Sequence, residues 1–227
     1  MLIQGLQKLT LLDYPGRLAA TVFLGGCNLR CPFCHNASLV VRPGDYSITE
    51  EEFFSFLESR RGRLEAVCVS GGEPTLRPEL PSFISKIKSM GFLVKLDTNG
   101  TRPDVLRSLV EAGLVDYVAM DIKNSKQSYS RTSGVEVNIA DIEASVAYLL
   151  SGAVDYEFRT TVVDGYHTVE DFISIGEWIR GAKAYFIQSF KDSGDIIAKG
   201  LEKPGEIEVF AFLEAVKPYV PNAQIRG

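Results

Sequence analysis

The chain has 227 residues, of which 45% are hydrophobic and 23% are charged, and this composition is ordinary for one globular domain. Its formal net charge of −5 argues against general nucleic-acid binding, because phosphate recognition needs a basic surface. No apolar run approaches the roughly 20 residues that span a bilayer, and the N-terminus lacks the features of a signal peptide. We therefore expect a single domain over residues 1–227, located in the cytoplasm, with neither nucleic acid nor membrane as a partner.

Two kinds of segment alternate along the chain. Six apolar, β-branched runs have the length of strands that are buried on both faces. These runs cover residues 19–25, 66–70, 92–98, 115–122, 156–163 and 184–189. Six segments with helical spacing follow them, at residues 49–60, 78–90, 103–112, 139–150, 168–180 and 206–216. Residues 1–18 form an extension before the first expected strand.

The ends of the expected helices carry capping signals. Thr49 precedes three glutamates, so its hydroxyl can cap the first helix while the acids favour the positive helix end. The helices 78–90 and 103–112 begin with proline, which suits a first turn, and stop before Gly91 and Gly113. These signals support the helix assignments.

Six strand–helix units in regular order predict an α/β fold with a parallel sheet and right-handed crossovers. An eight-unit barrel typically needs about 250 residues, so this chain predicts a partial, open TIM-like (β/α)6 barrel. A doubly wound open sheet is the alternative. In both architectures ligands bind at the C-terminal ends of the strands. The unusual motifs of this chain all follow expected strands directly, which predicts an active site at that edge of the sheet.

Three of the four cysteines, Cys27, Cys31 and Cys34, lie within eight residues after the first expected strand. A disulfide framework would spread its cysteines, so such a group in a cytosolic chain indicates a metal site. Three thiolates on one loop can ligate three irons of a [4Fe–4S] cluster and leave the fourth iron open to a substrate. The spacing alone leaves two alternatives, a zinc site completed by His35 and three thiols without metal. Cys68, in an apolar run, is expected to be a buried small residue.

The string GCNLRCPFCHN at residues 26–36 resembles the signature of the radical S-adenosylmethionine (SAM) superfamily, and in particular that of the glycyl-radical-enzyme activases. The resemblance implies a [4Fe–4S] cluster on the three cysteines, a free iron that chelates the amino and carboxylate groups of SAM, and Phe33 near the adenine. It also implies that one electron from the cluster cleaves SAM to a 5′-deoxyadenosyl radical, which abstracts a hydrogen atom. In such an enzyme the cofactors supply the radical chemistry, and the protein positions them.

The string SGGEP at residues 70–74 follows the second expected strand. Its paired glycines, Gly71 and Gly72, let the backbone approach a ligand closely, and Glu73 offers an acceptor for an ammonium group. An ordinary turn is the alternative. By the resemblance, this is the family element that binds the SAM amino group.

Two acidic motifs follow the third and fourth expected strands. The string DTNG at residues 97–100 is also a usual composition for a cap and turn. Asp121 and Lys123 are two apart on a strand and therefore share a face, where they could meet a zwitterion or form an ordinary ion pair. Both strings resemble those of pyruvate formate-lyase activase. The resemblance implies that Asp97, Thr98, Asp121 and Lys123 hold SAM, in some members through a monovalent cation, and that Lys123 and the three cysteines are catalytic.

Polar residues also occur in the last two expected strands. Arg159 lies among apolar neighbours, where a charge usually has a partner or ligand unless the strand end is exposed. Gln188 is similar, and we expect both to contact the cofactor. The family's adenine-contacting histidine has no counterpart near the sixth strand. Tyr166 and His167 follow the fifth strand, either at the mouth of the site or in a structural role.

The string LTLLDYPGR at residues 9–17 is similar to the start of anaerobic ribonucleoside-triphosphate reductase activating proteins. The resemblance implies a large glycyl radical enzyme as the partner and a one-electron donor such as flavodoxin or ferredoxin. Two other functions stay open. One is a radical SAM enzyme that acts on a small molecule such as a nucleotide or pterin precursor. The other is a non-catalytic metal-binding interaction module.

Overall fold

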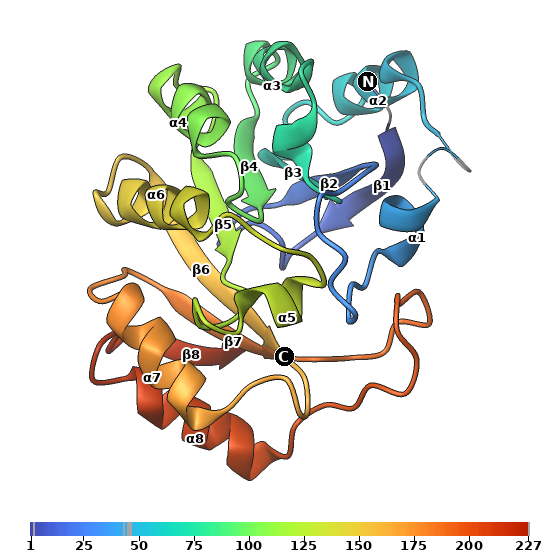
Figure 1. Ribbon diagram of the computed structural model, residues 1–227. Helices are drawn as coiled ribbons and strands as arrows, with labels where there is room; N and C mark the ends of the chain where they lie inside the picture. Colours follow the sequence, from blue (N-terminus) through green and yellow to red (C-terminus); the bar gives the residue numbers. More distant parts are fainter. Residues whose placement is uncertain (2, 43, 45–46, 227) are drawn as a thin grey trace.

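The computed structural model describes residues 1, 3–42, 44 and 47–226. Its strands form one eight-stranded sheet in which the order in space follows the order in the chain (Figure 1). The strands are β1 (Ile3–Thr10), β2 (Ala19–Leu24), β3 (Ala66–Gly71), β4 (Leu93–Thr98), β5 (Tyr117–Asp121), β6 (Asp155–Val162), β7 (Tyr185–Ser189) and β8 (Ala223–Arg226). β1 is antiparallel to β2, and all later neighbours are parallel.

This topology decides between the two expected architectures. A doubly wound sheet has a point where the strand order reverses, whereas the order here runs from β1 to β8 without reversal in the described part of the chain. β1 and β8 are the two edges of the sheet, so the barrel is open. The predicted partial barrel with a largely parallel sheet is confirmed.

The helices lie around the outer side of the curved sheet in Figure 1, apart from two short ones near its mouth, α1 and α5. Their bounds are α1 (Ala37–Val41), α2 (Glu50–Glu58), α3 (Leu80–Ser89), α4 (Pro103–Glu111), α5 (Tyr129–Ser133), α6 (Ile139–Leu150), α7 (Val169–Trp178) and α8 (Glu206–Val216), with a 3-10 turn η1 (Pro74–Leu76). The six expected helices are present with ends shifted by a few residues at most. The three short elements α1, α5 and η1 have too few residues to show a periodic pattern.

Two strands were not expected from the sequence. β1 lies inside the segment 1–18, and β8 follows the last expected helix. Polar residues interrupt the β1 sequence and β8 has four residues, so neither contains the apolar run that marks a strand buried on both faces. Both are edge strands, which explains why their composition differs from that of the central strands.

The capping residues support the observed helix ends. Thr49 caps α2 as expected, and the structure adds a reciprocal capping box with Glu52. In α3 the proline of the first turn is Pro81, so the helix begins two residues after Pro78. Gly91 and Gly113 have φ values of +90° and +66°, which favour glycine after a helix.

The two faces of the sheet carry different side chains. Outward residues such as Val67, Val69 and Leu96 pack with the helices in the main hydrophobic core. The alternating inward residues are small or polar, for example Cys68 and Ser70. This alternation leaves space inside the curve of the sheet and fills it with groups that can bind a polar ligand.

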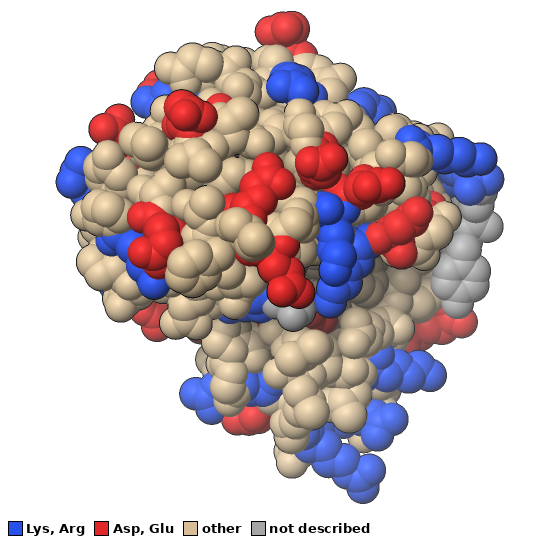
Figure 2. All heavy atoms as spheres, turned by 90° about the horizontal axis from the view of Figure 1, so that it is seen from below, with Lys and Arg blue, Asp and Glu red and all other residues tan. Residues whose placement is uncertain are grey.

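The side of the molecule on which α8 lies has mixed charge (Figure 2). Acidic side chains are scattered over the broad part of this face, and basic ones gather toward its narrower end. Ile207 and Phe210 of α8 are exposed, at 89% and 57%. No helix in the described ranges is long and apolar enough to cross a membrane.

Candidate active site

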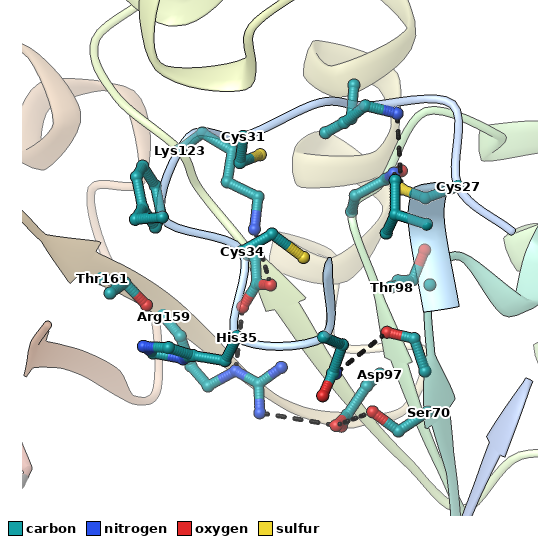
Figure 3. A pocket seen from close by; sticks show the side chains of 18 of the residues that line it. Cys27, Cys31, Cys34, His35, Ser70, Asp97, Thr98, Lys123, Arg159 and Thr161 are labelled. Atoms are coloured by element: carbon teal, nitrogen blue, oxygen red, sulfur yellow. Dashed lines mark hydrogen bonds and ion pairs between the residues drawn. The ribbon is translucent and has the colours of Figure 1, made fainter. Parts of the chain in front are cut away.

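A cavity of about 360 Å³ opens where the C-terminal ends of the strands meet the loop between β2 and α1 (Figure 3). Twelve of the thirteen residues predicted to form the site line this cavity. They are Cys27, Cys31, Phe33, Cys34, Gly71, Gly72, Asp97, Thr98, Asp121, Lys123, Arg159 and Gln188. Parallel strands end at one edge, and this brings together motifs that are far apart in the chain.

The three cysteines of the loop are free thiols at the cavity wall. Burial raises the pKa of Cys27 to about 11 and also raises the pKa of Cys31 and Cys34. The ammonium group of Lys123 acts in the opposite direction on all three thiols. The cavity therefore contains a cation that favours the thiolate form, which is the form that binds metal.

The loop between β2 and α1, residues 25–36, is called the cysteine loop here, and contacts from several parts of the chain hold it. The amide of Arg30 donates to the carbonyl of Ser133 in α5 at 2.9 Å. On the other side, the amide of Ala198 donates to the carbonyl of Pro32 at 2.9 Å. The ring of His35 stacks on Phe190 with centroids 5.6 Å apart. The residues after β7 therefore support the cysteine loop directly.

The paired glycines are required by contacts within the chain. Gly71 has a φ of +124°, and a Cβ atom there would lie 2.2 Å from the carbonyl oxygen of Leu24. A Cβ atom on Gly72 would lie 2.0 Å from the carbonyl oxygen of Gly26. Both glycines line the cavity, and within the chain the close approaches that demand glycine are to β2 and the cysteine loop.

Glu73 is the one predicted site residue that does not line the cavity, and its carboxylate is bonded within the chain instead. The side chain is 1% exposed, and burial raises its pKa. Its Oε1 accepts from the amide and hydroxyl of Thr75 and from the hydroxyl of Thr98, and its Oε2 accepts from the amide of Asn99. Glu73 thus links its own turn to the loop after β4.

Acidic and basic side chains alternate across the floor of the cavity. Asp121 Oδ2 accepts a hydrogen bond from Lys123 Nζ at 2.9 Å, and Asp121 Oδ1 accepts one from Arg159 Nε at 3.0 Å. Asp97 Oδ1 accepts a hydrogen bond from Lys95 Nζ at 2.5 Å, and the guanidinium group of Arg159 lies 3.6 Å from Asp97 Oδ2. Burial by itself would raise the pKa of both acids, but these cations outweigh it and hold both pKa values below the ordinary range. Lys95 does not line the cavity, so the cations that face it are Lys123 and Arg159, and either can meet a carboxylate of a ligand.

Lys123 does not belong to β5, which ends at Asp121, so the prediction that both residues lie on one strand is wrong. The chain still follows β6 beyond Asp121, because the amide of Ile122 donates to the carbonyl of Arg159 at 2.8 Å, and the two side chains meet in the ion pair. His167 supports this segment, since its Nε2 lies 3.0 Å from the carbonyl oxygen of Lys123. Its Nδ1 accepts from the amide of Val163 at 3.4 Å, so Nε2 carries the proton. Burial lowers the pKa of His167, which keeps the ring neutral in this structural role.

Several cavity residues were not among the predicted site residues. Asn36, Ser70 and Asn99 belong to the motif strings, so their proximity to the site was a usable signal. Thr161 lies two positions after Arg159 on β6 and shares its face. Asp13 lies in the loop between β1 and β2, and no local pattern could connect it with a cavity at the far end of the strands. Its carboxylate accepts from Thr21 at 2.5 Å.

An open α/β barrel with three free thiols beside a charged cavity defines a class of enzyme, and sequence comparison agrees with it. The model of the radical SAM superfamily matches residues 21–179, and the chain belongs to this superfamily. Its members use a [4Fe–4S] cluster and SAM. The site fits both, because three separate thiols face one cavity whose cations can meet a carboxylate.

Individual relatives are similar over nearly the whole chain. A Methanocaldococcus jannaschii protein, provisionally named a glycyl-radical enzyme activating enzyme, is 34% identical over 99% of this chain and 95% of its own length. The pyruvate formate-lyase-activating enzyme of Streptococcus mutans is 27% identical over 97% of this chain and 87% of its own length. In structure, a radical SAM methyltransferase from Sphaerobacter thermophilus matches 96% of this chain and 68% of its own, with a TM-score of 0.76 and 17% identity. This last likeness concerns the fold.

Proposed function

We propose that this protein activates a glycyl radical enzyme. In the proposed reaction, reductive cleavage of SAM leads to hydrogen abstraction from a glycine Cα of a separate partner protein and leaves a backbone radical there. The observation that carries the proposal is the 34% identity to the M. jannaschii protein, which extends over 95% of that protein's length. A similarity confined to the cysteine loop would support the superfamily alone.

We further propose that the partner is an anaerobic ribonucleoside-triphosphate reductase. The support is the string at residues 9–17, which is similar to the start of the activating proteins for that enzyme. One residue of this string, Asp13, lines the cavity, so the string is in contact with the site. A flavodoxin or ferredoxin is proposed as the electron donor, and the cytoplasm as the location, because its reducing conditions keep free thiols reduced.

The residues of the chain have distinct roles in this proposal. Cys27, Cys31 and Cys34 hold the [4Fe–4S] cluster, which supplies one electron to SAM when both are bound. Lys123 meets the carboxylate end of SAM, and Asp121 holds the lysine in place through the 2.9 Å ion pair.

The remaining cavity residues have roles around SAM. Gly71, Gly72, Asp97 and Thr98 surround its polar end, directly or with a monovalent cation. Phe33, Arg159 and Gln188 face its nucleoside end. Glu73 acts through the loops that it connects.

The test is isotope transfer from a labelled partner. Candidate glycyl radical proteins from the same genome are prepared with deuterium at glycine Cα and are incubated anaerobically with the reduced protein and SAM. We expect deuterium in the 5′-deoxyadenosine and a glycyl radical signal by electron paramagnetic resonance (EPR). A partner whose target glycine is replaced by alanine is the control and should show neither.

Two outcomes of this test separate the alternatives. Transfer from one glycyl radical protein and from no other identifies the partner. Cleavage of SAM without transfer from any of them would overturn the activase proposal and favour a small-molecule substrate such as a nucleotide or pterin precursor. Full cluster content in the same samples keeps that result distinct from a failure of cluster assembly.

A further inference from the structure

A hydrogen-bonded connection leads from the loop after β4 to the sulfur of Cys27. The side-chain nitrogen of Asn99 lies 3.8 Å from Cys27 Sγ and 2.9 Å from the Oδ1 of Asn28. Asn99 is 5% exposed, so solvent does not compete for this amide. The connection crosses 72 positions of the chain between Asn99 and Cys27.

The orientation of the Asn99 amide is decided by its other partners. Its Oδ1 accepts from the backbone amide of Thr101 at 3.0 Å and from the hydroxyl of Thr101 at 2.7 Å. Both of these groups are donors, so they select the oxygen of the amide. The NH2 group must then face Cys27, and a flipped amide would place two donors against each other.

Glu73 holds both ends of this connection at once. Its carboxylate accepts from the backbone amide of Asn99 at 2.6 Å, and its own amide donates to the carbonyl of Gly26 at 2.8 Å. Gly26 directly precedes Cys27. The separation between the Asn99 side chain and the Cys27 sulfur is therefore set by one buried residue rather than by two independent loops.

Cys27 differs in this respect from the other two cysteines. Its sulfur accepts a hydrogen bond from the backbone amide of Leu29 at 3.3 Å in addition to the one from the Asn99 side chain. Among the described contacts, Cys31 and Cys34 have no side-chain amide donor. An N–H group that points at a ligand sulfur withdraws negative charge from it, and hydrogen bonds to cluster sulfurs are among the factors that set reduction potential.

We propose that Asn99 is a positioning residue that donates an N–H···S hydrogen bond to the cluster ligand Cys27 and thereby raises the reduction potential of the cluster. The inference rests on cluster ligation by Cys27, which is part of the proposed function, but it does not depend on the identity of the partner. Because the amide stabilises added negative charge, its removal makes the cluster harder to reduce.

The test is a redox titration of the loaded protein followed by the EPR signal of the reduced cluster. Asn99→Ser removes the NH2 group without adding charge, and Asn99→Asp replaces it with an isosteric acceptor. At a fixed ambient potential we expect the ratio of reduced to oxidised cluster to fall about tenfold in Asn99→Asp, which is about 59 mV for one electron, and less in Asn99→Ser. Iron content per chain is measured in the same samples.

Asn28→Asp is the matched control, because it adds the same charge next to Cys27 while the Asn99 amide stays in place. The side-chain nitrogen of Asn28 donates to Thr101 and not to a sulfur. We expect a smaller shift in this variant than in Asn99→Asp. Equal shifts in the two would mean that charge alone is responsible, and unchanged potentials in both Asn99 variants would overturn the proposal.

A measurement on the unaltered protein covers the case in which the variants fail to assemble a cluster. Protein grown with asparagine labelled with 15N in the side chain is reduced and studied by pulsed EPR. We expect a hyperfine coupling from one side-chain nitrogen. The side-chain nitrogens of Asn28 and Asn36 donate to oxygen atoms, so Asn99 is the expected source. Absence of the coupling in fully loaded protein would reject the hydrogen bond.

Discussion

The carboxylate of Asp195 caps the short helix α1 from 157 positions away in the chain. It accepts from the backbone amide of Ser38 at 3.1 and 3.2 Å and from the hydroxyl of Ser38 at 2.7 Å. The local cap position, Asn36, makes no side-chain capping bond. Because α1 directly follows the cysteine loop, a residue after β7 controls how firmly that loop is held.

Asp195→Ala should loosen the cysteine loop. Loss of a capping side chain costs about 1 kcal/mol, and we expect a decrease of that order in the free energy of unfolding. Hydrogen exchange should become faster at residues 37–41 before it changes in the sheet. Asp192→Ala removes the same charge from the same segment, where the carboxylate accepts from Gly194, and should leave this exchange unchanged. Equal effects of the two substitutions would mean that the cap does not matter.

Each of the three loop cysteines should be needed for the cluster, and Cys68 should not. Cys68 is fully buried beside Tyr14 and Ala66, away from the cavity. Reconstituted wild-type protein and Cys68→Ala should hold about four irons per chain. Alanine at Cys27, Cys31 or Cys34 should remove most of the iron and the visible absorption. A cluster that survives in any of these three variants but is lost in Cys68→Ala would reject the ligand assignment.

Lys123→Ala should separate cluster binding from SAM cleavage. The lysine faces the cavity and pairs with Asp121, so its loss leaves the thiols in place but removes the cation that we propose meets the carboxylate of SAM. Misplacement of reacting groups by about 1 Å can cost a hundredfold in rate, and we expect at least that decrease in 5′-deoxyadenosine formation. Lys126→Ala is the control, because that lysine pairs with Glu143 and does not line the cavity. Normal cleavage by Lys123→Ala would remove the role assigned to it.

Gly72→Val should disturb the cysteine loop as well as SAM binding. A Cβ atom at this position would lie 2.0 Å from the carbonyl oxygen of Gly26, and a backbone atom cannot move aside without moving the loop. Iron content should therefore fall together with the binding of SAM. Gly205→Ala is the control, since no heavy atom lies within 4 Å of the place that a Cβ atom would take there and its φ is −62°. Full iron content in Gly72→Val would show that the loop can adapt.

Acid should destabilise the fold through Asp97 and Asp121. The pKa of each is lower in the folded chain than the value near 4 of an unfolded aspartate. Their paired charges therefore stabilise the fold above about pH 4, and this contribution is lost as the pH falls through the folded-state pKa. Chemical denaturation of the cluster-free chain at pH 7 and pH 3 should show a smaller difference in Asp97→Asn than in wild type. An equal difference would exclude Asp97 as a source of the acid sensitivity.

The sequence by itself determined the order of the elements and the positions of the motifs. The strands β2 to β7 were predictable because buried parallel strands are continuous apolar runs, and the helices because their spacing and caps are local. The cysteine spacing predicted a metal site for the same reason, since all three cysteines lie on one loop. The resemblance of the motif strings added most of the other residues that line the cavity, and Arg159 was predicted as a charge in a buried strand.

The tertiary structure alone decided which groups face the cavity and which hold it together. Glu73 turned inward to the loop after β4, Gly72 met the cysteine loop, and Asp195 capped a helix near the other end of the chain. Asp13 reached the cavity from the loop between β1 and β2. Such contacts join residues that are distant in sequence, and they depend on the curvature and register of the sheet. A local pattern records the period of a strand or helix, but it does not record what the neighbouring strand brings beside it.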